Sequence, residues 1–333
     1  NAQLPAIAKF VLAVIALAAC GLAISFAFKL ECWGGIFLLR SQYGLKLLDS
    51  LAKKYPKLWQ RFAEIGMVIG YGSLAYFLMR KAKIQWKNEV ATYAAGTVIL
   101  VLVSGILPIA MATLLSMMSG GSEFSSAGSR FQTAASQFEI FRYLAIAFLV
   151  LGGISLVTTM SIITYAGIVG AAIIGALLGN PAPLASTPPG GVPLLPGVNL
   201  DLVQGIAALA VVLIVHEGMH GILARLYKLP LKSAGLVFFG FLPFGAFVDI
   251  DEKKLFAEKK EKQNAVLVGG TAANFATAIF FLALLLLFVS IAGFLPQEFA
   301  RYTARFLALT FALNVIVAAV NLVPLRLFDG YHI

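Results

Sequence analysis

Ionisable side chains and cysteine are scarce in this chain. Only 12% of its 333 residues are charged, three are histidine and two are cysteine, whereas 60% are hydrophobic. This composition excludes an ordinary soluble domain and is typical of a protein that crosses a lipid bilayer several times. Cys20 and Cys32 lie about 18 Å apart if their segment is helical, which is too far for a disulfide bond. The net charge of +10 gathers beside the apolar runs, so it fits cytoplasmic loops next to anionic lipid and requires no nucleic-acid partner.

The apolar runs predict an all-α polytopic membrane protein with about seven transmembrane helices. The expected spans cover about residues 6–28, 62–79, 95–118, 141–178, 202–227, 265–292 and 303–321. Two of these runs leave alternatives open. Basic segments flank residues 62–79 on both sides, so this run is a short span or a re-entrant hairpin. Residues 141–178 are too long for one straight crossing and form one tilted helix or two joined spans.

Proline divides the chain into three parts. Six prolines in the loop at residues 180–200 cannot sit inside a helix. This loop separates an N-terminal membrane region, residues 1–179, from a core at residues 201–333. Within the N-terminal region, residues 34–61 mix leucine and lysine at helical spacing, which predicts an amphipathic helix on the cytoplasmic surface or, alternatively, a basic loop.

A short aromatic segment with glycine and proline, residues 235–250, is too short to cross a bilayer. It predicts a small β-hairpin or re-entrant element. An exposed edge of such a hairpin could pair with an extended peptide, and the alternative is a plain packed loop. The most charged loop of the chain, residues 249–263, follows at once and is expected on the cytoplasmic side.

The candidate metal-binding and catalytic residues lie in the sequence His-Glu-Gly-Met-His at residues 216–220, within an otherwise apolar run. His216 and His220 share one helix face, because residues four apart lie above one another. Two histidines at this spacing with a glutamate between them are the zincin pattern, in which Glu217 is the general base. Glutamate is costly at bilayer depth, so its presence there indicates a function. Structural histidines that bond neighbouring helices are the alternative.

A catalytic zinc site usually needs a third protein ligand. Asp329 is the carboxylate downstream of the motif that combines apolar surroundings with a place at the inner end of a span, where Pro324 interrupts the helix. We therefore expect Asp329 to be the third ligand. His332 is a rival ligand. The remaining downstream carboxylates lie in the charged loop or on the opposite side of the membrane: Asp249, Asp251, Glu252, Glu258, Glu261 and Glu298.

The chain resembles the site-2 protease family of intramembrane zinc metalloproteases, most closely its archaeal-type members. Three motifs carry this resemblance, and GLKLLDSLAKKY at 44–55 and PGVNL at 196–200 also look like archaeal relatives. HEGMH at 216–220 matches the family's HExxH, GGTAANF at 269–275 its GPxxN-type motif, and NLVPLRLFDG at 321–330 its motif ending in Leu-Asp-Gly. Thr271 replaces the usual proline and Phe328 the usual leucine. The resemblance covers residues 34–79 and 180–333, whereas residues 90–179 look like an extra membrane insertion.

The resemblance implies an enzyme with one zinc ion per chain, held by His216, His220 and Asp329. It further implies that Glu217 is the base and that Asn274 holds the substrate or the oxyanion. The expected substrates are membrane-anchored proteins, cleaved within or next to their transmembrane helices in regulated intramembrane proteolysis. The enzyme is then a multi-pass protein of the cell membrane, with its active site toward the cytoplasm.

Two other functions remain open at this stage. One is a non-catalytic transporter or receptor that binds metal in the membrane. The other is a zinc peptidase of the prenyl-protein type, in which a downstream glutamate such as Glu258 or Glu261 is the third ligand. Substrate identity and oligomeric state are left open by the sequence.

Overall fold

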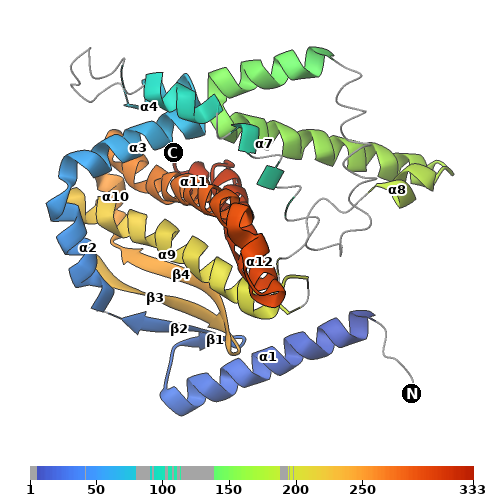
Figure 1. The fold of residues 1–333 in the computed structure, drawn as a ribbon, viewed down its shortest axis with the longest axis horizontal. Coiled ribbons are helices and arrows are strands. Elements are labelled where there is room, and N and C mark those ends of the chain that lie inside the picture. Colours follow the sequence, from blue (N-terminus) through green and yellow to red (C-terminus); the bar gives the residue numbers. More distant parts are fainter. Residues whose placement is uncertain are drawn as a thin grey trace.

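The computed structural model shows a helical protein with one small antiparallel sheet (Figure 1). It describes residues 6–41, 43–79, 139–187 and 199–333, with short pieces between residues 91 and 113 and between 194 and 197. The long helices are α1 (Ala6–Phe28), α3 (Pro56–Tyr71), α7 (Glu139–Leu177), α9 (Leu202–Leu226), α11 (Lys260–Ile291) and α12 (Gln297–Asn321). The short ones are α2 (Tyr43–Lys54), α4 (Leu74–Met79), α8 (Ala182–Ser186), α10 (Glu252–Ala257), η1 (Ala292–Phe294) and η2 (Asp329–Tyr331).

The core is formed by α9, α11 and α12, with α3 packed against α11 (Figure 1). Residues 266–275 of α11 are buried on every side, whereas most of the helix beyond residue 276 is exposed. An apolar helix that is buried all round lies inside a protein, and apolar positions that remain exposed are suited to lipid. The first half of α11 is therefore surrounded by protein, and its second half presents apolar side chains outward.

Four helices in the described part of the chain are long and apolar enough to cross a membrane: Ile146–Leu177, Leu202–Leu226, Lys260–Phe294 and Gln297–Asn321. The expected number of about seven is therefore not confirmed. Helix α1 contributes only a shorter apolar stretch, Val14–Phe28. Of the expected span at 95–118, residues 95–101, 104–106, 109–110 and 113 are described, and they include part of a shorter apolar helix, Ala94–Ile106. The division of the chain into 1–179, 180–200 and 201–333 stays a prediction.

The expected short span at 62–79 consists of two helices, α3 and α4, separated at Gly72. Gly72 has φ +53°, a left-handed conformation that favours glycine, and its main chain lies against α7. Ser73 donates from its amide to the carbonyl of Val150 at 2.8 Å. Helix α7 itself bends at Gly153, which has φ 62° and ψ −156°, so the long apolar run forms two helical segments joined at one residue.

The expected hairpin is confirmed by β3 (Leu231–Phe239) and β4 (Leu242–Ile250). It belongs to a larger sheet of order β1-β2-β3-β4, in which β1 is Cys32–Trp33 and β2 is Ile36–Ser41. The helix expected over residues 34–61 is wrong for its first part. These residues pair with β3 instead, and the buried ring of Phe37 stacks on Phe238 at 5.3 Å.

Helix α2 is amphipathic and packs on the metal-motif helix α9. Leu48 and Ala52 are buried, whereas Lys46 and the lysines of the last turn are exposed. The Leu48 side chain lies against Gly221, where an added Cβ would meet its Cδ1 at 2.6 Å. This contact sets α2 against α9 one residue after the histidine motif.

Candidate metal centre

Helix α9 holds the histidine motif at a fixed position because both of its ends are tied to other helices. At its N-terminus Asp201 pairs with Arg305 of α12 at 3.2 Å, and in its last turn Arg225 pairs with Asp49 of α2 at 2.8 Å. Its apolar residues pack against α11 and α12 between these ends. His216 and His220 point into that interface and are only 6% and 8% exposed.

Asp329 reaches the two histidines from the segment that follows α12. Pro324 lies just beyond the end of that helix, and the chain then turns back in η2. Gly330 allows this return, since a Cβ there would collide with the main-chain carbonyl of Leu322. Ser155 of α7 donates to the same carbonyl at 2.6 Å. The turn thereby brings the Asp329 carboxylate back to the level of the motif.

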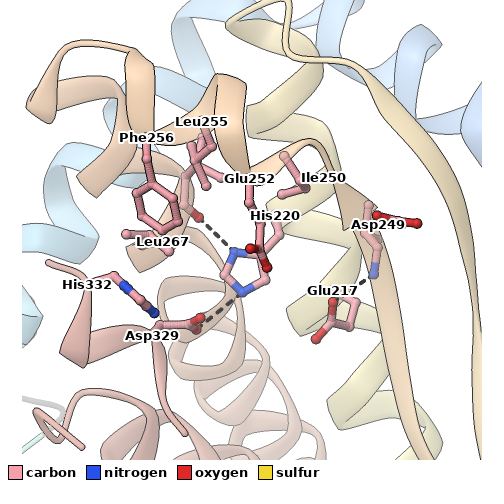
Figure 2. Close-up of a pocket in the computed structure, with 12 residues that line it drawn as sticks. Glu217, His220, Asp249, Ile250, Glu252, Leu255, Phe256, Leu267, Asp329 and His332 are labelled. Atoms are coloured by element: carbon pink, nitrogen blue, oxygen red, sulfur yellow. Dashed lines mark hydrogen bonds and ion pairs between the residues drawn. The ribbon is translucent and has the colours of Figure 1, made fainter. Parts of the chain in front are cut away.

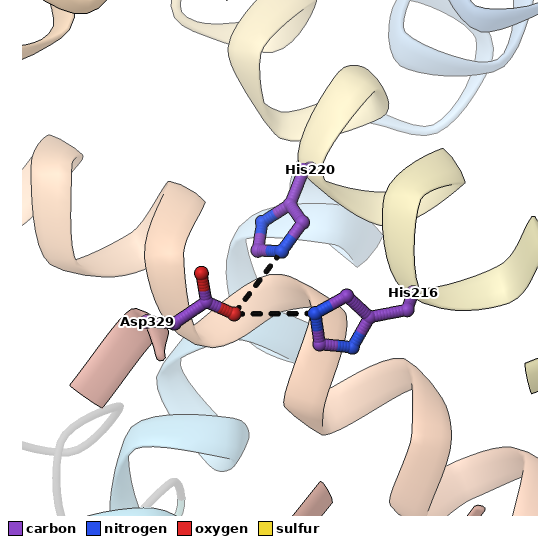
Figure 3. Close-up of side chains that lie close together, drawn as sticks. All are labelled: His216, His220 and Asp329. Carbon is purple, nitrogen blue, oxygen red and sulfur yellow. Dashed lines mark hydrogen bonds and ion pairs between the residues drawn. The ribbon is translucent and has the colours of Figure 1, made fainter. Parts of the chain in front are cut away.

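The three side chains converge as Figure 3 shows. Asp329 Oδ2 lies 3.2 Å from His216 Nε2 and 3.3 Å from His220 Nε2, and one ligand atom of each residue lies within 4.8 Å of the others. Burial opposes ionisation of the Asp329 carboxyl, but the charge of His220 and hydrogen bonds from both histidines hold its pKa below the usual range. Asp329 therefore remains an anion, which is the form that binds a metal.

The two separations that involve Asp329 match those of zinc ligands. Two ligands that bind zinc at about 2.0–2.1 Å with tetrahedral angles lie about 3.3 Å apart, whereas the ligand atoms of the whole group lie within 4.8 Å of one another. Gly270 of α11 provides room beside them. A Cβ at Gly270 would lie 2.5 Å from His220 Nε2 and 2.7 Å from His216 Nε2, so only glycine leaves this space free. Two imidazoles and one carboxylate are a donor set that zinc accepts.

Helix α11 supports both imidazoles on the side away from the carboxylate. His220 Nδ1 lies 2.7 Å from the carbonyl oxygen of Val266, so Nδ1 carries a proton, and a metal ion that displaces the proton from Nε2 would meet the lone pair of that nitrogen. His216 Nδ1 lies 3.2 Å from the amide nitrogen of Asn274. Val266, Gly270 and Asn274 are spaced by four residues, which puts them on one face of α11.

Glu217 shares a cavity of about 310 Å³ with two of the ligands, His220 and Asp329 (Figure 2). Glu217 Oε2 accepts a hydrogen bond from the main-chain N–H of Val248 in β4 at 3.0 Å. The cavity is bounded by α9, β4, α10, α11 and the segment after α12. Its lining consists of Glu217, His220, Val248, Asp249, Ile250, Glu252, Leu255, Phe256, Val266, Leu267, Asp329 and His332.

His332 lines the cavity without joining the ligand group. Among the described residues the metal-binding group consists of His216, His220 and Asp329. The His332 ring instead packs against Phe256 at 5.1 Å and Tyr331 at 5.0 Å between centroids. The geometry therefore favours Asp329 over His332 as the third ligand.

Glu258, a possible third ligand in the prenyl-protein alternative, also lies apart from this group. Its carboxylate accepts from Lys262 Nζ at 2.8 Å, and this bond holds the pKa of Glu258 below its usual value. Glu261 lies in the first turn of α11. The arrangement therefore gives no support to a glutamate ligand from the charged loop.

Asn274 lies behind His216, and its expected contact with the substrate or the oxyanion stays a prediction. Its side chain is fully buried, faces the back of His216, and is not among the residues that line the cavity. Sequence reasoning also missed the contributions of Val248, Val266 and Gly270. A signal was present only for Gly270, because a pair of glycines inside a helix often marks a close approach of another group.

Comparisons with known proteins agree with the motifs. Residues 204–301 match the model of peptidase family M50. Over 78 residues the chain is 36% identical to the uncharacterized protein MJ0971 of Methanocaldococcus jannaschii. That alignment covers 23% of this chain and 21% of the relative. No solved structure matches the chain.

The family match spans most of α9, the β3–β4 hairpin and α11, which contribute both histidines, Glu217 and the supporting face of α11. Asp329 lies beyond the matched residues but completes the same group of side chains. The archaeal type of the family stays a prediction. Residues 204–301 are therefore similar to peptidase family M50, in agreement with the family that the motifs predicted.

Proposed function

We propose that the protein is a zinc-dependent intramembrane endopeptidase of the site-2 protease type. It hydrolyses peptide bonds within or next to the transmembrane helices of membrane-anchored proteins, as in regulated intramembrane proteolysis. The observation that carries this proposal is the convergence of His216, His220 and Asp329 inside apolar helices, with Glu217 in the adjoining cavity. One zinc ion per chain would satisfy this donor set.

His216, His220 and Asp329 would hold the ion and leave one position for water or substrate. Zinc, when bound, supplies a Lewis acid that polarises the scissile carbonyl and acidifies water. Glu217 takes the proton of the attacking water and passes it to the leaving amine, because it lines the same cavity as His220 and Asp329. The apolar walls Ile250, Leu255 and Leu267 limit the water around these groups.

The edge strand β4 is our proposed platform for the substrate. In the order β1-β2-β3-β4 it has a strand partner on one side only, so an extended peptide could pair with the groups of its outer edge, one of which, the Val248 N–H, now donates to Glu217. Three β4 residues, Val248, Asp249 and Ile250, also line the cavity. A substrate helix must unwind before cleavage, since its carbonyls are otherwise hydrogen-bonded, and pairing with β4 would hold the unwound segment beside Glu217.

The contact between Glu217 and Val248 links substrate binding with catalysis. The Val248 N–H, which now donates to Glu217 at 3.0 Å, is a group that an added strand would use. A peptide carbonyl that takes this N–H leaves the Glu217 carboxylate free to accept a proton from water. The base would thus become available when a peptide occupies the edge of the sheet.

We further propose that the cavity opens toward the cytoplasm. Helix α10, which borders it, carries exposed Lys253 and Lys254, and Lys259 and Lys260 follow directly. Clusters of lysine next to membrane spans favour the cytoplasmic side. A reporter domain fused within residues 252–260 and found on the side of the membrane opposite the cytoplasm would contradict this orientation.

The proposed base is tested by Glu217→Gln, with Glu252→Gln as the matched control because both carboxylates line the same cavity. We expect Glu217→Gln to retain zinc and to lower the cleavage rate roughly 100- to 10,000-fold. Glu252→Gln should cleave at nearly the parent rate. The measurement is cleavage of a single-span reporter protein in proteoliposomes, together with the zinc content of each variant.

The same comparison separates the proposed function from its alternatives. A metal-binding transporter or receptor would show no cleavage in the parent protein and no specific effect of Glu217→Gln on the reporter. Unchanged cleavage in Glu217→Gln would remove Glu217 from the reaction. Equal losses in both variants would indicate a general dependence on the charge of the cavity.

A further inference from the structure

Asn274 contacts the proposed metal ligand His216 at Nδ1, the ring nitrogen that does not face Asp329. It lies in the fully buried part of α11, and its Nδ2 atom is 3.2 Å from Nδ1 of His216. Its carbonyl oxygen Oδ1 is also buried and has no hydrogen-bond partner. An unpaired buried amide oxygen is costly, so its place next to a histidine nitrogen requires a physical reason.

The chemistry of a bound histidine supplies that reason. A histidine that binds metal through Nε2 carries its proton on Nδ1 and donates it to an acceptor. The Asn274 amide now presents a donor to this position. A half-turn of the amide exchanges its oxygen and nitrogen without altering its shape. Oδ1 then accepts from the His216 Nδ1–H, and the amide nitrogen takes the position that the oxygen occupied.

His220 is already supported in the corresponding way. Its Nδ1 lies 2.7 Å from the Val266 carbonyl, eight residues before Asn274 on the same face of α11. Gly270 lies midway between them and leaves the space beside the two Nε2 atoms open. One helix face thus provides a main-chain acceptor for one ligand, a side-chain acceptor for the other, and room for the ion.

We propose that Asn274 is a positioning residue whose amide oxygen accepts the Nδ1 proton of His216 and so orients this imidazole toward the metal. This inference rests on the proposed metal centre. It differs from the expected contact with substrate or oxyanion, because Asn274 is completely buried behind His216 and does not line the cavity. Support of this kind typically changes metal affinity by roughly 10- to 100-fold.

The test compares zinc affinity of the full-length, detergent-solubilised protein in three variants, measured by competition with a chromophoric chelator. Asn274→Leu removes the acceptor and should weaken zinc binding roughly 10- to 100-fold. Asn274→Asp keeps an acceptor and should bind zinc within a few-fold of the parent. Asn314→Leu is the control, since Asn314 is an equally buried asparagine with an unpaired Oδ1 and should leave zinc affinity unchanged.

Cleavage separates positioning from direct catalysis. A positioning role predicts that Asn274→Asp cleaves the reporter at close to the parent rate. A group that stabilises the oxyanion would lose far more in Asn274→Asp, because the new carboxylate repels the developing charge. Parent zinc affinity in Asn274→Leu, or greater loss of cleavage in Asn274→Asp than in Asn274→Leu, would overturn the proposal.

Three further outcomes are informative. If Asn274→Leu shows no cooperative thermal unfolding, this variant is not folded and gives no test. The zinc affinity and cleavage rate of Asn274→Asp then test the proposal by themselves. If the parent binds zinc without cleaving any reporter, the proposed protease function fails while the affinities still test Asn274. A parent that binds no zinc would overturn both.

Discussion

Gly270 shows how much a single position can control in this site. The space beside the two imidazole Nε2 atoms exists because residue 270 has no Cβ. An added methyl group would lie within 2.5 Å of His220 Nε2, far inside van der Waals contact. Densely packed interiors relax only partly around such an intrusion. The imidazoles would have to move apart from Asp329.

We therefore expect Gly270→Ala to lower zinc affinity by more than roughly tenfold, at least the loss typical of weakened ligand support. Gly218→Ala is the matched control. Gly218 lies inside the motif itself, yet an added Cβ there meets nothing within 4 Å, and alanine favours a helix by up to about 1 kcal/mol. Chelator competition on both variants is the measurement. Parent affinity in Gly270→Ala would show that the space beside the ligands is not used by the ion.

Part of the site is readable at the level of residue types, and part is not. The spacing of His216 and His220 predicts their shared face, and the apolar setting of Asp329 singles it out among the carboxylates. The contact between Asn274 and His216 depends on the register in which α11 packs against α9. Two helices whose motif residues are 58 positions apart can pack in several registers, and no local pattern selects one.

At the scale of elements, the small sheet illustrates a long-range effect. Alternating glycine, proline and aromatic residues predict the β3–β4 hairpin because its partners are close in sequence. Strand β2 is different, since Ile36–Ser41 pairs with β3 about 200 residues later. Its leucines and arginine fit a helix equally well when the chain is considered locally. Strand formation there depends on tertiary pairing rather than on intrinsic propensity.

The two edges of this sheet provide a test of the proposed substrate platform. We expect a single cysteine at Val248 or Ala246 of β4 to form a disulfide with a single-cysteine reporter in the Glu217→Gln background, after Cys20 and Cys32 are replaced by serine. A cysteine at Trp33 of β1 is the control, because it lies exposed at the opposite edge. Gel mobility after mild oxidation reports the cross-link. Cross-links of equal yield at both edges would rule out specific pairing with β4.

At the scale of the whole molecule, the number of spans was the least predictable feature. Hydropathy locates apolar runs but does not detect breaks such as Gly72 and Gly153, which have positive φ angles. At both breaks the main chains of α3 and α7 approach closely. A Cβ on Gly153 would lie 2.5 Å from the Gly70 carbonyl oxygen. Contacts between separate helices thus decide where each run bends.

The metal centre also has a consequence for global stability. His216 and Asp329 are 113 positions apart in the chain, and the three ligands connect α9 with the segment after α12. Zinc bound only by the native protein stabilises it by about 2.7 kcal/mol when its concentration is about 100 times the dissociation constant. For a chain of 333 residues, whose unfolding entropy is about 2.1 cal/mol/K per residue, such a gain raises Tm by roughly 4 °C.

We therefore expect added zinc to raise the Tm of the metal-free parent protein by this amount, and EDTA to reverse the rise. Asp329→Ala should lose the response because only two ligands remain. His332→Ala should keep it, since His332 packs against Phe256 and Tyr331 outside the ligand group. Thermal unfolding in detergent, followed by tryptophan fluorescence, is the measurement. If zinc raised the Tm of Asp329→Ala fully and did not raise that of His332→Ala, His332 would be the third ligand in place of Asp329. This result would refute the geometry of the centre.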